Sequence, residues 1–278
     1  MTGTEVRVSP AWLRLREDED AAARSRELAR AVRAWPGPGE VRVVHDLGAG
    51  DGSMGRWLGP LLGGPQHWVL HDRDPDLLHA AAGAPPVPSP GGPRTAVETR
   101  VGDITRLTSA DLRGASLVTA SALLDVLTLE EVGRLVRLWA DVGAPVLVAL
   151  SVTGRVQLHP TDVLDGLLTS AFNDHQRRAT ARGALLGPEA VRVTVALLHQ
   201  LGWRVRLRPS PWRLDGRRPA LTEEWLHGWV GAAVEQRPEL GPAAEAYVEA
   251  RTAQLAAGAL RVGVHHLDLL ALPGGGPR

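Results

Sequence analysis

Apolar and polar residues follow one another along the middle of the chain in two different patterns. Short apolar runs bounded by glycine, proline or aspartate are typical of buried strands, and longer stretches with apolar residues three or four positions apart are typical of helices. The regular alternation of the two patterns predicts an α/β fold with a doubly wound, mostly parallel sheet. The expected strands are 41–48, 67–72, 96–101, 116–122 and 145–151, and the expected helices are 53–62, 75–82, a short one after residue 108, and 129–142.

The first 35 residues have a helical pattern instead. Ser9 and Pro10 suit an N-cap and a first helical position, and apolar residues between Ala21 and Trp35 recur at helical spacing. A Pro-Gly-Pro-Gly sequence at 36–39 ends the pattern. The sequence therefore predicts two N-terminal helices, which form a helical cap over residues 1–40.

The last 125 or so residues are less regular, but they add two strands to the sheet. With them, the pattern predicts a seven-stranded sheet whose last strand is antiparallel. We expect a single domain over 1–278, with a core at 41–154 and two additional segments, 155–187 and 208–260, that cover one edge of the sheet. The expected helices in this part are 160–182, 188–201, 222–235 and 242–257, and the expected strands are 203–209 and 261–272.

Composition narrows the chemistry that this fold could carry. The 278 residues include no cysteine and no lysine, so thiolate nucleophiles, disulfides, Schiff bases and the P-loop lysine are excluded. The 31 arginines balance 31 acidic residues, and a net charge of zero without a basic block argues against a nucleic-acid partner. No apolar run is long enough to span a membrane and no secretory signal pattern is visible, so we expect a cytoplasmic protein without membrane contact.

The sharpest motif is the glycine-rich sequence that follows the first expected strand. Asp46 stands at the strand end, and Gly48, Gly50 and Gly52 alternate after it, where the chain must turn and enter the next helix. Such a turn lets the backbone approach a ligand closely. Asp72 ends the second expected strand, and a carboxylate there can accept hydrogen bonds from both hydroxyls of a ribose. The motif therefore predicts a cofactor that contains a nucleoside.

Two kinds of cofactor fit these residues. Gly50, Gly52 and Gly55 match the spacing of a dinucleotide fingerprint, which would make the chain an NAD(P)-dependent oxidoreductase. However, a carboxylate at Asp46 would repel a pyrophosphate, whereas it suits a cofactor with a cationic amino group. A third alternative is a non-catalytic nucleoside-binding protein of the same fold.

Four motifs at successive strand ends carry a resemblance to a known family. DLGAGDG, HDRDPDLL, GDI and SALLDVL follow strands one to four, and over residues 41–151 the sequence resembles the class I S-adenosylmethionine-dependent methyltransferases. The resemblance implies a Rossmann-like methyltransferase fold with S-adenosyl-L-methionine as the cofactor. It also implies roles for single residues. Asp46, Gly48, Gly50 and Gly52 would surround the methionine part, Asp72 would hold the ribose, Arg73, Asp103 and Ile104 would contact the adenine, and Ser121 would lie near the sulfonium.

The methyl acceptor should lie at the carboxyl edge of the sheet, under the two covering segments. A base is needed only if the acceptor loses a proton, and we expect His175, or else Asp125, to take it, because a histidine titrates near neutral pH. Residues expected to bind the acceptor are Asn173, Arg155, Arg177 and Trp212. His265 and His266 are adjacent on a strand and point to opposite sides, so we expect no metal site.

The sequence thus predicts an enzyme that methylates nitrogen or oxygen of a small molecule, for instance in secondary metabolism. We expect its partner to be a small-molecule acceptor, and the chain to be a monomer or a homodimer.

Overall fold

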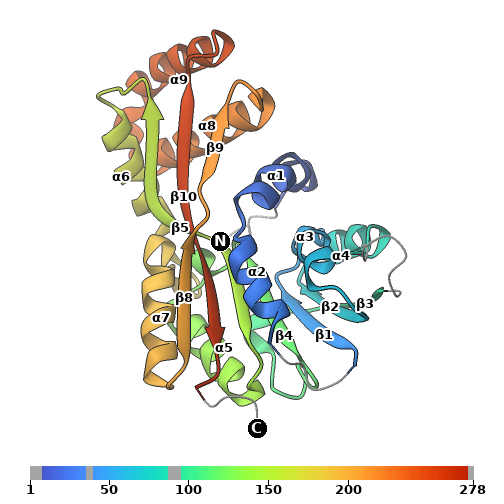
Figure 1. The fold of residues 1–278 in the computed structure, drawn as a ribbon. Helices are drawn as coiled ribbons and strands as arrows, with labels where there is room; N and C mark the ends of the chain where they lie inside the picture. Colours follow the sequence, from blue (N-terminus) through green and yellow to red (C-terminus); the bar gives the residue numbers. More distant parts are fainter. Residues whose placement is uncertain (1–7, 36–39, 87–94, 275–278) are drawn as a thin grey trace.

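A mostly parallel sheet runs through the whole molecule (Figure 1). The computed structural model describes residues 8–35, 40–86 and 95–274. Seven strands follow the order β3-β2-β1-β4-β5-β10-β8, and β9 pairs with β10 beside them. Because β10 is antiparallel to both β5 and β8, the expected antiparallel last strand is confirmed. In the described part of the chain the sheet has eight strands instead of the expected seven, because the short strand β9 also pairs with β10. The strands are β1 (Arg42–Leu47), β2 (Gln66–Asp72), β3 (Thr95–Val101), β4 (Leu117–Ser121), β5 (Val146–His159), β8 (Arg204–Pro209), β9 (Trp212–Asp215) and β10 (Arg261–Leu272).

Helices cover both faces of the lower part of the sheet. On one face, Leu28 of α2 and Leu58 of α3 are fully buried in one apolar core with Trp68 of β2. On the other face, Trp139 of α5 and Leu198 of α7 pack in a second core with β4 and β5. The helices are α2 (Arg26–Arg33), α3 (Ser53–Leu62), α4 (Pro75–Gly83), α5 (Leu129–Val142) and α7 (Ala190–Gln200).

The strands β5 and β10 continue beyond the sheet's carboxyl edge and form an upper lobe together with β9 (Figure 1). Three helices pack against one face of these strands, and the stacked rings of Trp225 and Trp229, 5.3 Å apart, lie in their core. The helices are α6 (Asp165–Gln176), α8 (Pro219–Gln236) and α9 (Gly241–Ala256). The segments expected to cover the edge of the sheet therefore form this lobe.

Three sequence predictions differ from the structure. The strand expected to end at residue 151 continues to His159, because β10 pairs with it over its whole length. The helix expected over 160–182 is α6, which ends at Gln176 and is followed by a short hairpin of β6 (Ala179–Thr180) and β7 (Gly183–Ala184). After residue 108 there is a turn rather than a helix, because Asp111 accepts hydrogen bonds from the backbone and hydroxyl of Thr108.

The two N-terminal helices are present as α1 (Pro10–Ala23) and α2, with Ser25 capping the second. In Figure 1, α1 lies between the upper lobe and α3, above the sheet's carboxyl edge. None of the helices that the structure describes is long and apolar enough to cross a membrane.

Candidate functional site

The glycine loop joins β1 to α3 through a series of left-handed turns. Gly48, Gly50 and Gly52 have φ angles of +66°, +55° and +86°. Residues other than glycine rarely adopt these φ angles, because their Cβ atom collides with the backbone. A Cβ on Gly48 would also lie 3.0 Å from Leu123. The alternating glycines of the motif are thus required by the path of the backbone.

Asp72 holds this loop from the end of the neighbouring strand β2. Its Oδ2 accepts a hydrogen bond from the Gly50 N–H at 2.8 Å, and its Oδ1 accepts one from the Asp74 N–H at 2.9 Å. Each carboxylate oxygen has a second lone pair, and the side chain is only partly buried. Asp72 can therefore position the loop and still accept hydrogen bonds from a ligand.

Asp46 is buried at the end of β1, with 1% of its surface exposed. Thr119 donates a hydrogen bond to its Oδ1 at 2.7 Å, whereas its Oδ2 has no partner among the residues that the structure describes. Burial raises the pKa of Asp46 to about 6, although the Thr119 hydroxyl and the Arg24 guanidinium act in the opposite direction. Its free oxygen is suited to a cationic donor.

Arg24, which the sequence analysis did not single out, provides a positive charge in the same region. Its guanidinium donates to the carbonyl and hydroxyl of Ser53 at 3.3 and 3.2 Å, and to the hydroxyl of Ser121 at 3.0 Å. Its Nε has no partner in the described part of the chain, and the nearest ion-pair oxygen, of Asp20, is 3.7 Å away. Burial lowers its pKa. An almost fully buried guanidinium without a directly bonded carboxylate is suited to an anionic ligand.

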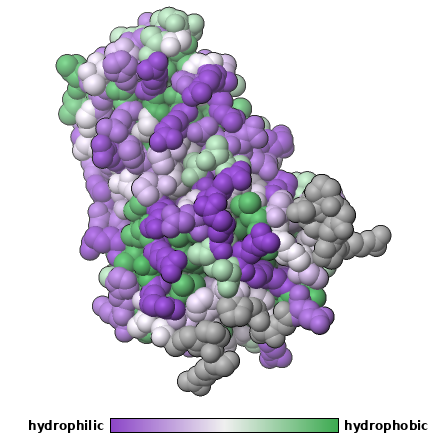
Figure 2. Space-filling view, viewed as in Figure 1, coloured by the Kyte–Doolittle hydropathy of each residue, from purple (hydrophilic) through white to green (hydrophobic). Residues whose placement is uncertain are grey.

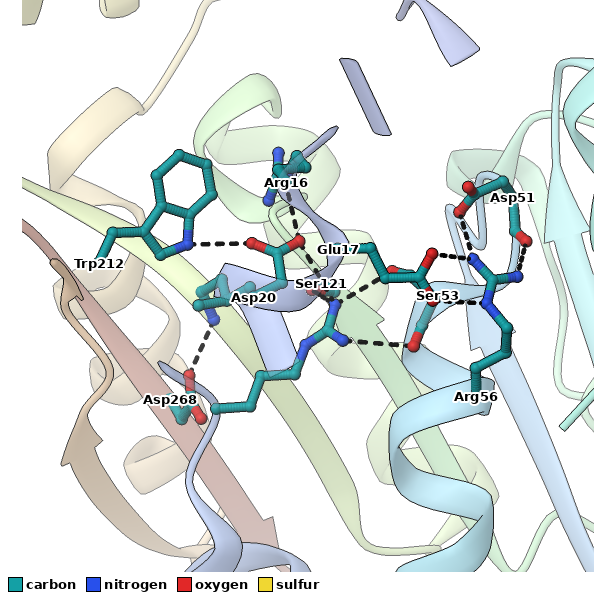
Figure 3. A network of polar contacts seen from close by, with 11 residues as sticks. Arg16, Glu17, Asp20, Asp51, Ser53, Arg56, Ser121, Trp212 and Asp268 are labelled. Carbon is teal, nitrogen blue, oxygen red and sulfur yellow. Dashed lines mark hydrogen bonds and ion pairs between the residues drawn. The ribbon is translucent and has the colours of Figure 1, made fainter. Parts of the chain in front are cut away.

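Helix α1 closes over this region by polar contacts on two sides (Figure 3). On one side, Glu17 binds Arg56 of α3 through two hydrogen bonds of 2.6 and 2.8 Å, and Arg56 also contacts Asp51 of the glycine loop. On the other side, Asp20 accepts a hydrogen bond from Trp212 of β9 at 3.0 Å. The helix therefore connects the glycine loop to the upper lobe.

The residues expected at the adenine lie further along the same edge of the sheet. Asp103 is exposed and caps the short helix Ile104–Arg106, where its Oδ1 accepts hydrogen bonds from the backbone and hydroxyl of Thr105. Asp103 and Ile104 line a hollow of about 850 Å³ together with residues of α5. Arg73 follows Asp72 and is exposed.

The end of β4 leads to Asp125 through a strained backbone. Ala122 has a φ of +50°, a value that costs a residue with a Cβ about 1–2 kcal/mol. Asp125 then follows on a short helix (Leu124–Val126), and its Oδ1 is buried without a partner among the described residues. Burial raises the pKa of Asp125, and Arg16 of α1 is a cation that opposes this shift. The carboxyl group is suited to binding or releasing a proton.

The other acceptor-side candidates lie apart from one another. His175 contacts Glu235 of α8 at 3.3 Å, and burial followed by the charge of Arg178 lowers its pKa. Asn173 donates to the Gly154 carbonyl at 2.8 Å. Arg155 is exposed, and Arg177 is exposed and paired with Asp174.

No protein-family model matches this chain, and no curated protein is significantly similar to it in sequence. Among solved structures, a protein from Anaeromyxobacter dehalogenans that is assigned to the type II methyltransferases superposes with a TM-score of 0.52. The two sequences are 16% identical, and the match covers 91% of this chain and 98% of that one. The chain has the class I methyltransferase fold. The Rossmann-like architecture expected from the sequence is confirmed, and a likeness at this identity shows the fold alone.

Two further solved structures match this chain at lower TM-scores. The cyclopropane synthase MmaA2 from Mycobacterium tuberculosis has a TM-score of 0.47 and 11% identity, over 88% of this chain and 82% of that one. A SAM-dependent methyltransferase from Geobacter sulfurreducens, in complex with S-adenosyl-L-homocysteine, has a TM-score of 0.40 and 18% identity, over 95% and 91%.

The methyltransferase fold brings the cofactor candidates together and separates most of the acceptor candidates. Asp46, Asp72 and Ser121 end three neighbouring strands at one edge, beside the glycine loop. Of the residues expected to bind the acceptor, Trp212 reaches this region through Asp20. His175 contacts Glu235 and Arg177 pairs with Asp174, both in the upper lobe, and Arg155 forms no ion pair or hydrogen bond with a described residue.

Proposed function

We propose that this chain is an enzyme that transfers a methyl group from S-adenosyl-L-methionine to a small-molecule acceptor. The observation that carries the proposal is the pair of opposite charges beside the glycine loop. Asp46 has a buried oxygen and Arg24 a buried N–H, each without a partner among the described residues. An α-amino acid carries an ammonium and a carboxylate, which would satisfy both groups.

The remaining cofactor roles follow from the order of the strand ends. Asp72 would accept hydrogen bonds from the ribose, and Gly48, Gly50 and Gly52 would let the backbone approach the cofactor. Ser121, at the end of β4, would lie near the sulfonium. Arg73, Asp103 and Ile104 would surround the adenine. These assignments come from the family resemblance, and each residue stands at the carboxyl edge of the sheet.

The chemistry required of the protein is mainly positioning. When bound, S-adenosyl-L-methionine supplies a methyl group on a sulfonium, ready for in-line displacement. Asp125 would take the proton that an acceptor nitrogen or oxygen releases, since its carboxyl oxygen is buried and unpartnered at the end of β4. We favour Asp125 over His175, because the His175 ring is engaged with Glu235 on the far helix. Trp212 and Asn173 are the acceptor-binding candidates that we retain.

A dinucleotide cofactor is a weaker alternative. Gly55 completes that fingerprint, but a Cβ there would lie 2.9 Å from Pro86 and 3.4 Å from Trp68, so the packing of α3 alone explains this glycine. The buried carboxylate of Asp46 would also face the pyrophosphate.

Calorimetric titrations of the purified chain with S-adenosyl-L-homocysteine and with NAD test the cofactor. We expect a single site for S-adenosyl-L-homocysteine and no heat of binding for NAD. Binding of NAD alone would overturn the proposal. Transfer of labelled methyl from S-adenosyl-L-methionine to amine or hydroxyl acceptors then separates an enzyme from a non-catalytic nucleoside-binding protein.

We propose a small molecule rather than a nucleic acid as the methyl acceptor. A net charge of zero over 278 residues, without a basic block in the sequence, argues against a polyanionic acceptor. Methylation of nitrogen or oxygen, a cytoplasmic location and a monomeric or homodimeric state stay predictions.

A further inference from the structure

One face of the strands in the upper lobe carries a second concentration of charge, remote from the glycine loop. The face opposite to α8 and α9 is formed by β5, β10 and β9. Two rows of residues cross it: His159 pairs with Arg261, which pairs with Asp215, and Gln157 pairs with Gly263, which pairs with Arg213. Arg155 and His265 lie on the same strands, closer to the main sheet. The upper half of the molecule in Figure 2 is accordingly rich in hydrophilic residues.

Three arginines on this face form no ion pair with a described carboxylate, although the charge of Arg261 acts on its cross-strand neighbour Asp215. Arg155, Arg213 and Arg261 are exposed, and none of their guanidinium groups makes an ion pair or a hydrogen bond with any described residue. The charges of Arg155 and Arg213 also help to lower the pKa of His265, after burial, which indicates that both lie near its ring. The single acidic side chain of the two rows, Asp215, is held by Arg217 at 2.8 Å.

The end of this face, next to Arg213 and Arg261, is hollowed, and the Asp215–Arg217 pair also lines the hollow. A hollow of about 950 Å³ is lined by Arg213, Arg261, His159 and Gln157, among others. Its glycines leave the space open, because a Cβ on Gly263 would meet no atom closer than 3.7 Å. The volume suits a ligand of nucleotide size.

We propose that this hollow binds a phosphate-bearing small molecule, through Arg213 and Arg261 with Arg155 at its border. Arg213 and Arg261 are diagonal neighbours on adjacent strands, so their side chains can converge on one anion. Guanidinium groups bind phosphate bidentately, and a dianion compensates the excess positive charge better than a single carboxylate does.

Two features of the hollow constrain the ligand, one its size and the other the position of its anionic group. The hollow is a confined space, and the few arginines around it do not form the long basic track that nucleic acids require. The C-terminal end of α9, at Leu255 and Ala256, borders the hollow and carries partial negative charge. The anion is therefore expected at the side of β9 and β10, away from that helix end.

Titration of the full chain with inorganic pyrophosphate, followed by calorimetry, tests the site. We expect the double variant Arg213→Ala/Arg261→Ala to bind pyrophosphate at least about tenfold more weakly than the wild type. The matched control is Arg204→Ala/Arg206→Ala on the edge strand β8, where both arginines are exposed and unpaired among the described residues. This control removes the same charge and should keep wild-type affinity.

A charge-preserving variant separates the hollow from general electrostatics. Gly263→Leu keeps every arginine but fills the space, and it should also lose binding at least about tenfold. Equal weakening in both double variants, no binding in the wild type, or normal binding by Gly263→Leu would overturn the proposal. Tighter binding of a single-stranded RNA than of pyrophosphate, abolished by the Arg213/Arg261 variant, would overturn it in favour of nucleic acid. Thermal melting checks that each variant is folded.

Discussion

Three polar atoms at the carboxyl edge of the sheet are buried without a partner in the described part of the chain. They are Oδ2 of Asp46, Nε of Arg24 and Oδ1 of Asp125. A buried polar group without a hydrogen bond costs about 1–3 kcal/mol. If the cofactor and the acceptor form hydrogen bonds with these three atoms, the bound protein no longer has unpaired buried groups. The free energy lost in the unbound protein is then explained by ligand binding.

Replacement of Asp72 should weaken cofactor binding directly. We expect Asp72→Ala to weaken binding of S-adenosyl-L-homocysteine by about 10- to 100-fold, because the ribose loses its acceptor and Gly50 loses a hydrogen bond. Calorimetry measures the change. Asp162→Ala is the matched control, since this carboxylate also accepts a backbone hydrogen bond in a turn, but in the upper lobe, just before α6. Equal loss in both variants would contradict the assignment.

Asp125 should determine the pH dependence of turnover. Its folded pKa is raised, so the carboxylate that accepts a proton forms as pH rises through that raised value, and kcat should rise with it. We expect Asp125→Asn to lower kcat by about 10²- to 10⁴-fold and to remove this limb of the pH profile. Affinity for S-adenosyl-L-homocysteine should be unchanged. An unaltered kcat in Asp125→Asn, with a loss in His175→Ala, would reverse the choice of base.

The sequence motif identified site residues that lie close together in the chain, but it missed Arg24, whose hydrogen-bond partners are distant in the sequence. The alternating glycines and Asp72 belong to a short motif, and their predicted geometry is present. Arg24 contacts Ser53 and Ser121, which are 29 and 97 residues away, and nothing in its own helix distinguishes it from 30 other arginines. The sequence pattern placed Arg24 inside the second N-terminal helix, whereas in the structure it lies at the break between α1 and α2.

Charged side chains contribute much of the contact between helix α1 and the rest of the molecule, beside the partly buried Trp12 and Leu15. Its buried residues are Glu19 and Asp20, and the Glu17–Arg56 ion pair connects it to α3. Leu13 lies 3.4 Å from the position of a Cβ on Gly50, so the helix covers the cofactor region. Ion pairs at a partly exposed interface weaken with salt.

We therefore expect Glu17→Gln to speed dissociation of S-adenosyl-L-homocysteine by about two- to fivefold at low salt, with a smaller difference at high salt. Stopped-flow dissociation measures this rate. Glu27→Gln is the control, since Glu27 of α2 forms an equivalent two-bond pair with Arg208 of β8, outside the cofactor region. A similar acceleration in the control, or none in Glu17→Gln, would mean that α1 does not limit exit.

At the level of elements, predictions failed where long-range pairing decides the outcome. Periodicity placed α3 and α5 at their observed bounds. It ended β5 at residue 151, since the residues that follow alternate weakly, and β10 extends the strand to His159 through antiparallel pairing. Such pairing joins residues about 100 positions apart and leaves little local signal.

Stability of the whole molecule should depend on a buried histidine pair in the centre of the sheet. His45 and His71 lie 3.0 Å apart, and burial lowers the pKa of each from 6.5 to about 4. Between pH 6.5 and 4 the two histidines bind protons in the unfolded chain but not in the folded protein. The stability that the neutral pair contributes is therefore lost as pH falls from about 6.5 towards 4. Asp46, Asp125 and Asp268, whose pKa values are raised, act in the opposite direction.

A comparison of variants isolates the histidines from these aspartates. Relative to His45→Leu/His71→Leu, the wild type should lose on the order of 4 kcal/mol of unfolding free energy between pH 7 and pH 5, about half of it from each histidine. Urea denaturation at the two pH values measures it. If the difference in unfolding free energy between the two proteins were the same at pH 7 and at pH 5, the histidine pair would not titrate differently in the folded and unfolded states over this pH range.

The central claim is that the site recognises the amino-acid part of S-adenosyl-L-methionine through Asp46 and Arg24. The most direct measurement compares calorimetric affinities for S-adenosyl-L-homocysteine and for 5′-methylthioadenosine, which has no amino acid. We expect the wild type to prefer S-adenosyl-L-homocysteine by at least about tenfold, and Arg24→Gln and Asp46→Asn each to reduce that preference with little change for 5′-methylthioadenosine. Equal affinity of the wild type for both compounds, or an equal loss for both in the variants, would contradict the account.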